Sequence, residues 1–143
     1  MYDRILFPTD GSDGAETALE HALDLAAVHD AAIHVLFVVN TTYLGGSAAE
    51  ATTVDALRTT GETTVEESAD RVRDRGVDVT TTIRSGEPYR EILDYADEAA
   101  ADVIVMGTHG RRGLDRYLLG SVTEKVVRAA DVPVLTVRAD EEG

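Results

Sequence analysis

Apolar positions follow two alternating patterns along the chain. Short runs that are almost wholly apolar, such as residues 4–8 and 33–39, are typical of strands buried on both faces. After the first run, small apolar residues recur at intervals of three and four, which predicts an amphipathic helix capped by Ser12 or Asp13. The apolar face of this helix is formed by Ala15, Ala18, Leu19, Ala22, Leu23 and Ala26.

The rest of the chain repeats this alternation. Residues 77–83, 103–106 and 132–137 are predicted strands, whereas residues 41–53 show no period and are predicted to form a long loop. A second, polar helix ends near Gly76, and Pro88 lies in the first turn of a third. The apolar faces of the later helices comprise Val54, Leu57, Val65, Ala69 and Val72; Tyr89, Ile92, Leu93, Ala96 and Ala100; and Val122, Val126, Val127 and Ala130.

The resulting element order, βαβαβαβαβ, predicts an α/β fold. We expect a single doubly wound, Rossmann-like domain over residues 1–143, with a five-stranded parallel sheet in the order 3-2-1-4-5. In that order the first and fourth strands are neighbours, and ligands bind in the crevice at their carboxyl ends. Asp10 follows the first strand and Gly107 ends the fourth, so both are expected at that crevice.

Three glycines close to the predicted crevice form a pattern, G-x2-G-x9-G-S. They are Gly107, Gly110 and Gly120, and the last opens the fourth helix. Glycine lets backbone N–H groups approach a ligand, and a helix N-terminus attracts anions, so the pattern favours a phosphate site. Two structural explanations of these residues require no ligand: Ser121 and Glu124 match a capping box, and the first two glycines fit a simple turn.

Composition narrows the classes of function. The chain has no cysteine, which excludes disulfides, thiolate zinc sites and cysteine nucleophiles. Its net charge of −14 disfavours nucleic acid and anionic membranes as partners. No apolar stretch approaches the roughly 18 residues of a membrane span, and an apolar run starts at Ile5, so we expect a cytoplasmic protein.

The charge balance also suggests a salt-rich environment. Lys125 is the only lysine among 13 basic residues, set against 27 acidic ones. Self-repulsion at this charge destabilises a compact state unless salt screens it, which favours a halophilic, acidic protein. The positive charges gather between Gly107 and Arg128, where an anionic ligand or merely a solvated loop would account for them: Arg111, Arg112, Arg116, Lys125 and Arg128.

No catalytic or metal-binding constellation is visible. His21, His29 and His34 lack the spacing of metal ligands. A nucleophile, base and orienting group do not occur together, so we assign no catalytic residue and no metal ligand.

Taken together, these segments resemble the universal stress proteins, specifically their ATP-binding subclass. The resemblance runs through residues 8–12, 85–88, 101–110, 118–122 and 132–137, and the glycine spacing is the family's ATP signature. It implies ATP with Mg²⁺ as the ligand. Backbone N–H groups of Gly107, Gly110, Gly120, Ser121 and Val122 would hold the ribose and phosphates, and the Ser121 hydroxyl would add a donor.

The resemblance also implies the remaining contacts. Asp10 would lie on the adenosine side, the Val39 backbone would meet the adenine edge, and Pro8 and Thr9 would form the wall. Met106 and Thr123 are the additional neighbours that the resemblance implies. His109 completes the expected site because it lies within the glycine pair, where either contact with phosphate or simple solvation would account for it.

Two functions are compatible with such a site. The first is a dimeric, nucleotide-dependent regulator in stress adaptation; the second is a slow ATPase or phosphotransferase. Catalysis requires a cation near the γ-phosphate, for which Arg111, Arg112 and Lys125 are candidates, but no Walker lysine is present. The fifth strand is apolar and lies at a sheet edge, so we expect a homodimer that covers Val132, Val134, Leu135 and Val137.

Overall fold

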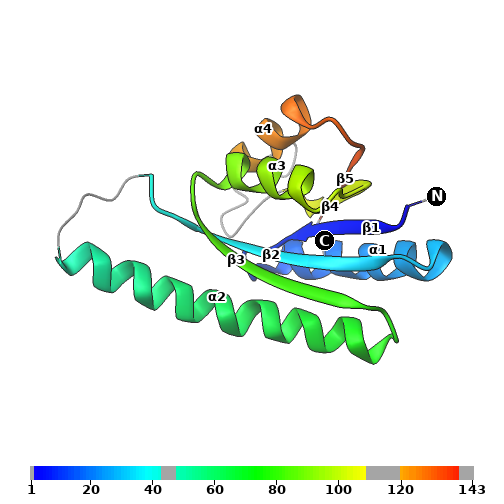
Figure 1. Cartoon of the computed structure of the whole chain (residues 1–143), viewed down its shortest axis with the longest axis horizontal. Coiled ribbons are helices and arrows are strands. Elements are labelled where there is room, and N and C mark those ends of the chain that lie inside the picture. The colour runs from blue at the N-terminus through cyan, green and yellow to red at the C-terminus, as the bar shows by residue number, and fades with distance from the viewer. Residues whose placement is uncertain (1, 43–47, 109–119, 139–143) are drawn as a thin grey trace, which may run out of the picture.

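A parallel five-stranded sheet forms the centre of the computed structural model, which describes residues 2–42, 48–108 and 120–138 (Figure 1). The strand order β3-β2-β1-β4-β5 confirms the predicted α/β, doubly wound topology. Its strands are β1 (Arg4–Pro8), β2 (Ala32–Asn40), β3 (Val79–Gly86), β4 (Val103–Gly107) and β5 (Val134–Val137).

Two helices cover each face of the sheet. α1 (Asp13–His29) and α2 (Ala48–Asp74) lie on one face, and α3 (Pro88–Glu98) and α4 (Ser121–Ala129) lie on the other (Figure 1). Because side chains alternate along a strand, Phe37 of β2 packs with α1 and α2, whereas Leu36 packs with α3 and α4. Both side chains are buried, so the strands are apolar on both faces.

The predicted loop over residues 41–53 is wrong in its second half, because α2 begins at Ala48. This stretch lacks an apolar period, yet its first four residues are three alanines and a glutamate, which are strong helix formers. Figure 1 shows the start of α2 extending beyond the strand ends. A helix turn in that position does not require an apolar face. Its sequence therefore indicates the helix only through the helix propensity of its residues.

Other boundaries shift by a few residues. β3 runs over Val79–Gly86 instead of 77–83, because Val77 still donates to the Val72 carbonyl at the end of α2. β5 starts at Val134 instead of 132, since Pro133 has no N–H to donate to a ladder. Ala100 lies beyond α3, with a φ of 55°, and so is not part of its apolar face.

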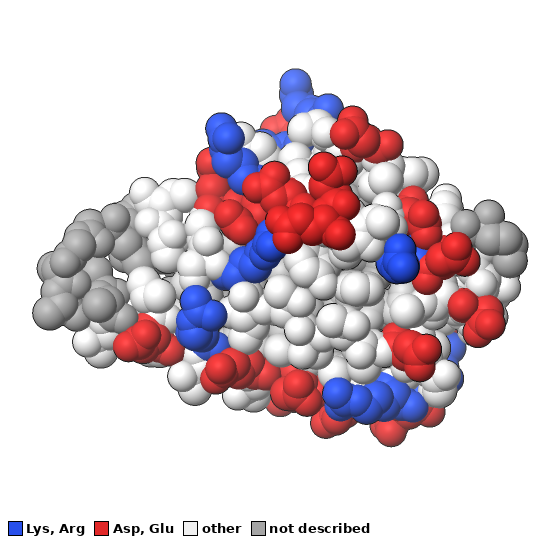
Figure 2. Space-filling model, viewed as in Figure 1, with Lys and Arg blue, Asp and Glu red and all other residues white. Residues whose placement is uncertain are grey.

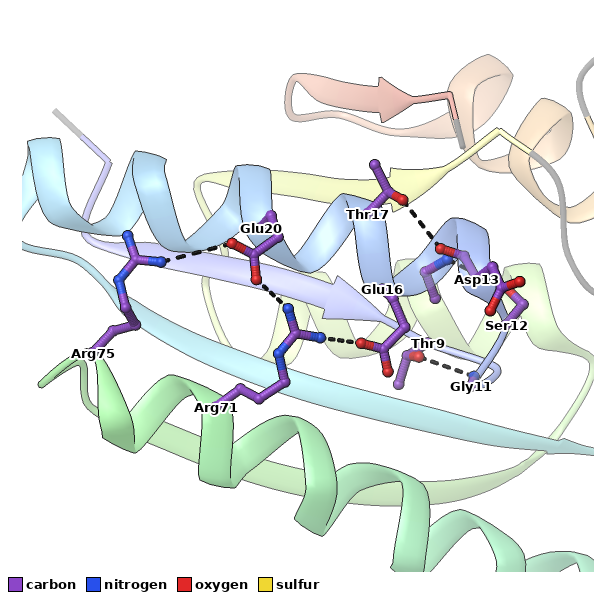
Figure 3. Close-up of polar contacts among 10 residues, drawn as sticks. Thr9, Gly11, Ser12, Asp13, Glu16, Thr17, Glu20, Arg71 and Arg75 are labelled. Carbon is purple, nitrogen blue, oxygen red and sulfur yellow. Dashed lines mark hydrogen bonds and ion pairs between the residues drawn. The ribbon is translucent and has the colours of Figure 1, made fainter. Parts of the chain in front are cut away.

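Polar contacts fix the ends of α1 and tie it to α2. Ser12 is the N-cap, and its hydroxyl accepts from the Ala15 backbone N–H at 3.3 Å. Figure 3 shows Arg71 of α2 reaching both Glu16 and Glu20 of α1. These side chains are partly exposed, so each pair adds stability of roughly 0–1 kcal/mol.

His34 of β2 is a half-buried polar group under α3. Its Nδ1 lies 2.8 Å from the Tyr95 hydroxyl, and that hydroxyl accepts a hydrogen bond from the Thr82 hydroxyl at 3.2 Å. Burial, and then the positive charge of Arg4, lower the pKa of His34. The neutral imidazole is therefore the form that the folded state favours.

Acidification should accordingly destabilise the fold through His34. The unfolded chain takes up the proton more readily, so this residue's contribution is present above the unfolded pKa of about 6.5 and is lost as the pH falls through the lower folded value. His34→Gln retains a neutral hydrogen-bonding group. We expect its unfolding free energy to fall less than that of the wild type between pH 7.5 and 5, measured by urea denaturation.

His21→Gln provides the matched control, because it makes the same substitution at an exposed position of α1. Equal slopes for the wild type and His34→Gln would show that burial of His34 does not disfavour its charged form.

Candidate ligand-binding site

A cavity of about 630 Å³ opens at the carboxyl ends of β1, β2 and β4. This volume is within the range of small-molecule sites, about 300–1,000 Å³. The starts of α1, α3 and α4 and the middle of α2 complete its wall. The cavity therefore lies at the β1–β4 junction, where the sheet order reverses its direction of winding.

Most of the residues expected at the site line this cavity: Pro8, Thr9, Asp10, Met106, Gly107, Gly120, Ser121, Val122 and Thr123. Val39 is not among the lining residues. Its side chain is buried on the sheet face covered by α1 and α2, and its neighbours Val38 and Asn40 line the cavity instead. His109 and Gly110 lie outside the described residues.

The N-terminus of α4 reaches the cavity without a side-chain cap. Gly120 is the N-cap residue and Ser121 the first residue of the helix, so Ser121 does not serve as the cap of a capping box with Glu124. Two bonds hold this end on β4: Gly120 N–H donates to the Thr108 carbonyl at 2.6 Å, and the Thr123 hydroxyl donates to the Gly107 carbonyl at 2.8 Å. The positive end of the helix dipole thus lies at the cavity wall.

Gly107 has a packing role in addition to its place in the wall. A Cβ built at this position would lie 3.1 Å from both the backbone carbon and oxygen of Gly14 in α1. The first turn of α1 can therefore approach β4 closely only because residue 107 is glycine. The sequence pattern identified the residue, but its packing against α1 was not predictable from spacing.

The turn between β1 and α1 places Asp10 at the cavity. Thr9 N–H donates to the Leu36 carbonyl at 2.9 Å, and its hydroxyl accepts from Gly11 N–H at 3.0 Å (Figure 3). Ser12 N–H donates to Asp10 Oδ1 at 2.9 Å. Gly11 has a φ of 80°, a conformation that favours glycine. The turn is therefore held by local bonds, and it positions the Asp10 carboxyl group at the wall.

Several lining residues were not predicted as site residues. Leu57 and Thr60 come from α2, and Pro88 and Ile92 from α3. Leu57 and Ile92 were assigned to apolar helix faces and Pro88 to the first turn of a helix. Those assignments do not reveal which turn of a helix reaches the cavity. α2 crosses β2 so closely that a Cβ on Gly61 would lie 2.6 Å from the Phe37 ring. This unusual helix glycine was the available indication that α2 contacts the strand here.

The predicted cluster of positive charge is only partly described. Lys125 Nζ lies 5.2 Å from the centre of the Tyr89 ring, and Arg128 pairs with Glu124 at 3.3 Å. Arg111, Arg112 and Arg116 lie outside the described residues. Neither Lys125 nor Arg128 lines the cavity, so the described wall contains no lysine or arginine.

No group of three or more His, Cys, Asp or Glu side chains within residues 2–42, 48–108 and 120–138 is arranged to hold a metal ion. In the same part of the chain, no helix has both the length and the apolarity to cross a membrane.

Comparisons with known proteins agree with the fold and with the family resemblance. The model of the universal stress protein family matches residues 1–138. Universal stress protein MJ0531 of Methanocaldococcus jannaschii is 37% identical over 141 residues, covering 96% of this chain and 83% of the relative. The chain belongs to the universal stress protein family.

Solved structures show the same relationship. The structure of MJ0577 from the same organism has a TM-score of 0.90 at 32% identity and covers 99% of both chains. A universal stress protein solved in complex with cAMP has a TM-score of 0.76 at 27% identity, covering 97% of this chain and 99% of the other. An adenine nucleotide is thus the ligand of one structural neighbour.

Proposed function

We propose that this chain binds ATP in the cavity at the β1–β4 junction and acts as a nucleotide-dependent regulator in stress adaptation. The observation that carries the proposal is the uncapped N-terminus of α4 at the wall of a cavity of about 630 Å³. The backbone N–H groups of Ser121 and Val122 are in the first turn, where an α-helix leaves its donors unsatisfied. Phosphate is the ligand chemistry that suits such an end.

The two ends of the cavity suit the two ends of a nucleotide. Leu36, Val38, Ile92 and Met106 provide an apolar surface for a base. The Gly120–Thr123 segment at the start of α4 provides backbone N–H groups and the Ser121 hydroxyl for phosphates. Asp10, which we assign to the adenosine end, is the carboxylate among the described lining residues. Mg²⁺ would therefore be held mainly by the phosphates and water, as it prefers.

Regulation fits the described wall better than catalysis does. Phosphoryl transfer needs a cation that stabilises charge on the moving phosphoryl group. Arginine and lysine are missing from the described lining. Binding without rapid turnover is the consequence.

Two measurements on one preparation test this function. Purified protein is denatured, and the released small molecules are identified by mass spectrometry; we expect an adenine nucleotide in amounts approaching one per chain. Phosphate release from added MgATP should stay close to the rate without protein. Turnover far above that rate would favour the ATPase or phosphotransferase, and a preparation that neither contains nor takes up nucleotide would contradict both functions.

We propose in addition that the chain forms a homodimer through β5. This strand is at an edge of the sheet, and Leu135 on it is 40% exposed. An apolar sheet edge promotes pairing with another strand, and a two-fold axis would let two copies cover each other. Val127 of α4, the helix that follows β4, is also exposed, so it is a further candidate for the covered surface.

Leu135→Arg should therefore produce a less stable monomer or an aggregate, because a charge in the paired edge would be buried. Size-exclusion chromatography with light scattering measures the mass. Val28→Arg is the matched control, since Val28 is 76% exposed on α1 and should leave the dimer intact. A wild type that runs as a monomer at micromolar concentration would contradict the dimer.

The surface charge supports a further proposal, that the protein functions in a salt-rich cytoplasm. Figure 2 shows Asp and Glu spread widely over one face, with fewer Lys and Arg among them. At a net charge of −14, the folded state benefits from screening.

A further inference from the structure

Asn40 is a single neutral amide at the wall of the cavity. It is the last residue of β2, is half-buried, and lines the cavity beside Val38. The chain contains no other asparagine and no glutamine, against 27 aspartates and glutamates. At this position an amide differs from the common acidic side chains in two properties: it offers N–H donors and it carries no charge.

The orientation of the Asn40 amide is fixed by Thr42. Oδ1 of Asn40 accepts from the Thr42 backbone N–H at 3.1 Å and from the Thr42 hydroxyl at 2.7 Å. A backbone N–H only donates, so the amide oxygen must face it and the NH₂ group must face away. Within residues 2–42, 48–108 and 120–138, that NH₂ group has no hydrogen-bond partner.

The backbone at Asn40 is held in place by the neighbouring strand β3. Asn40 pairs with Gly86 of β3, and Thr41 N–H donates to the Gly86 carbonyl at 3.2 Å. By the alternation of a strand, Asn40 is on the same sheet face as Leu36 and Val38. Leu36 and Val38 belong to the apolar surface assigned above to the base. A planar base lying against that surface would present its edge toward the end of β2, where Asn40 lies.

We propose that Asn40 Nδ2 donates a hydrogen bond to a ring nitrogen of the adenine base. The inference rests on the proposed function, and it makes Asn40 a residue that contacts the ligand and fixes the orientation of the base. Ring nitrogens N1, N3 and N7 are acceptors, as the partner of an N–H must be. An aspartate here would present only acceptors and would add negative charge to a site for an anion.

Deaza analogues of adenosine test this contact atom by atom. Adenosine, 1-deaza-, 3-deaza- and 7-deazaadenosine are titrated calorimetrically into the wild type and into Asn40→Ala. We expect Asn40→Ala to bind adenosine about tenfold more weakly, in line with the loss of one well-placed hydrogen bond. One analogue should bind the wild type about tenfold more weakly than adenosine does, and this difference should vanish in Asn40→Ala.

A second pair of variants separates the donor from the turn. Asn40→Asp keeps an oxygen for both Thr42 bonds and removes the NH₂ group, so it should lose at least as much affinity for adenosine as Asn40→Ala does. Neutral adenosine is the probe, because repulsion between Asp and phosphates would obscure the result with ATP. Thr42→Val is the control: it removes the bond at 2.7 Å, keeps the backbone bond, and should change affinity by less than about threefold.

The outcomes distinguish this inference from the proposed function. If the wild type binds adenosine and the analogue pattern is the same in Asn40→Ala, the contact is wrong and the nucleotide site stands. Wild-type affinity in Asn40→Asp would overturn the contact as well. A wild type that binds neither adenosine nor ATP would overturn both proposals. Thermal melts of each variant confirm that the protein titrated is folded.

Discussion

Gly120→Val should abolish ATP binding and leave the fold in place. Gly120 has φ −63° and ψ 156°, a conformation that valine adopts without strain. It lines the cavity directly before Ser121, so a branched side chain would occupy the space that a phosphate needs to reach the first-turn N–H groups. We expect an affinity at least 100-fold lower by calorimetry. Loss of stability should stay near 1 kcal/mol, the usual scale for a poorer N-cap residue.

Gly107→Val is the informative comparison, because there the structure predicts a different result. Its Cβ would lie 3.1 Å from the Gly14 backbone, so α1 must shift away from β4. Overpacking of this kind costs about 1–3 kcal/mol, and stability and binding should fall together. If Gly120→Val binds ATP as the wild type does, the start of α4 does not hold phosphate, whatever the behaviour of Gly107→Val.

Thermal stability should rise steeply with salt. Raising KCl from 0.05 M to 2 M should increase the melting temperature by roughly 10 °C, equivalent to about 3–4 kcal/mol for a chain of this length. The physical reason is screening of the repulsion among 27 acidic side chains that only 13 basic ones offset. Differential scanning calorimetry at constant pH measures the change.

Salt also weakens attractive pairs, and the two effects can be separated. Arg71 of α2 and Arg75, which directly follows α2, pair with Glu16, Glu20 and Asp24 of α1. These pairs are partly exposed and worth roughly 0–1 kcal/mol each. Repulsion should therefore dominate. Arg71→Met removes the central cation and should steepen the dependence on salt. A melting temperature that is flat, or highest in dilute buffer, would contradict the salt-rich setting.

The topology was predictable because its determinants are local. Apolar runs such as Ile5–Phe7 indicate strands that are buried on both faces of the sheet. Because these strands alternate with helices, only a few topologies of a parallel sheet are possible. The start of α2 was not predictable in the same way. Ala48 belongs to a helix turn that forms because its residues have high helix propensity, and the periodicity of apolar residues does not detect such a turn.

In the candidate site, too, residues marked by a local sequence pattern were predictable, and residues that depend on tertiary packing were not. Asp10 and Gly120 follow directly from strand ends and glycine spacing, and both line one cavity. Val39 was assigned through its backbone, without a motif to fix its register. Its side chain is buried among residues of α1 and α2, and its neighbours Val38 and Asn40 line the cavity. Leu57 reaches the cavity only because α2 crosses β2 closely. Such packing between distant elements leaves no periodic pattern in the sequence.

A titration of MgATP into nucleotide-free wild-type protein tests the central claim most directly. The measurement is made by isothermal calorimetry in high salt, where the fold is expected to be most stable. The account predicts saturable binding of one ATP per chain, lost in Gly120→Val. Absence of saturable binding to folded wild-type protein at millimolar ATP would contradict it.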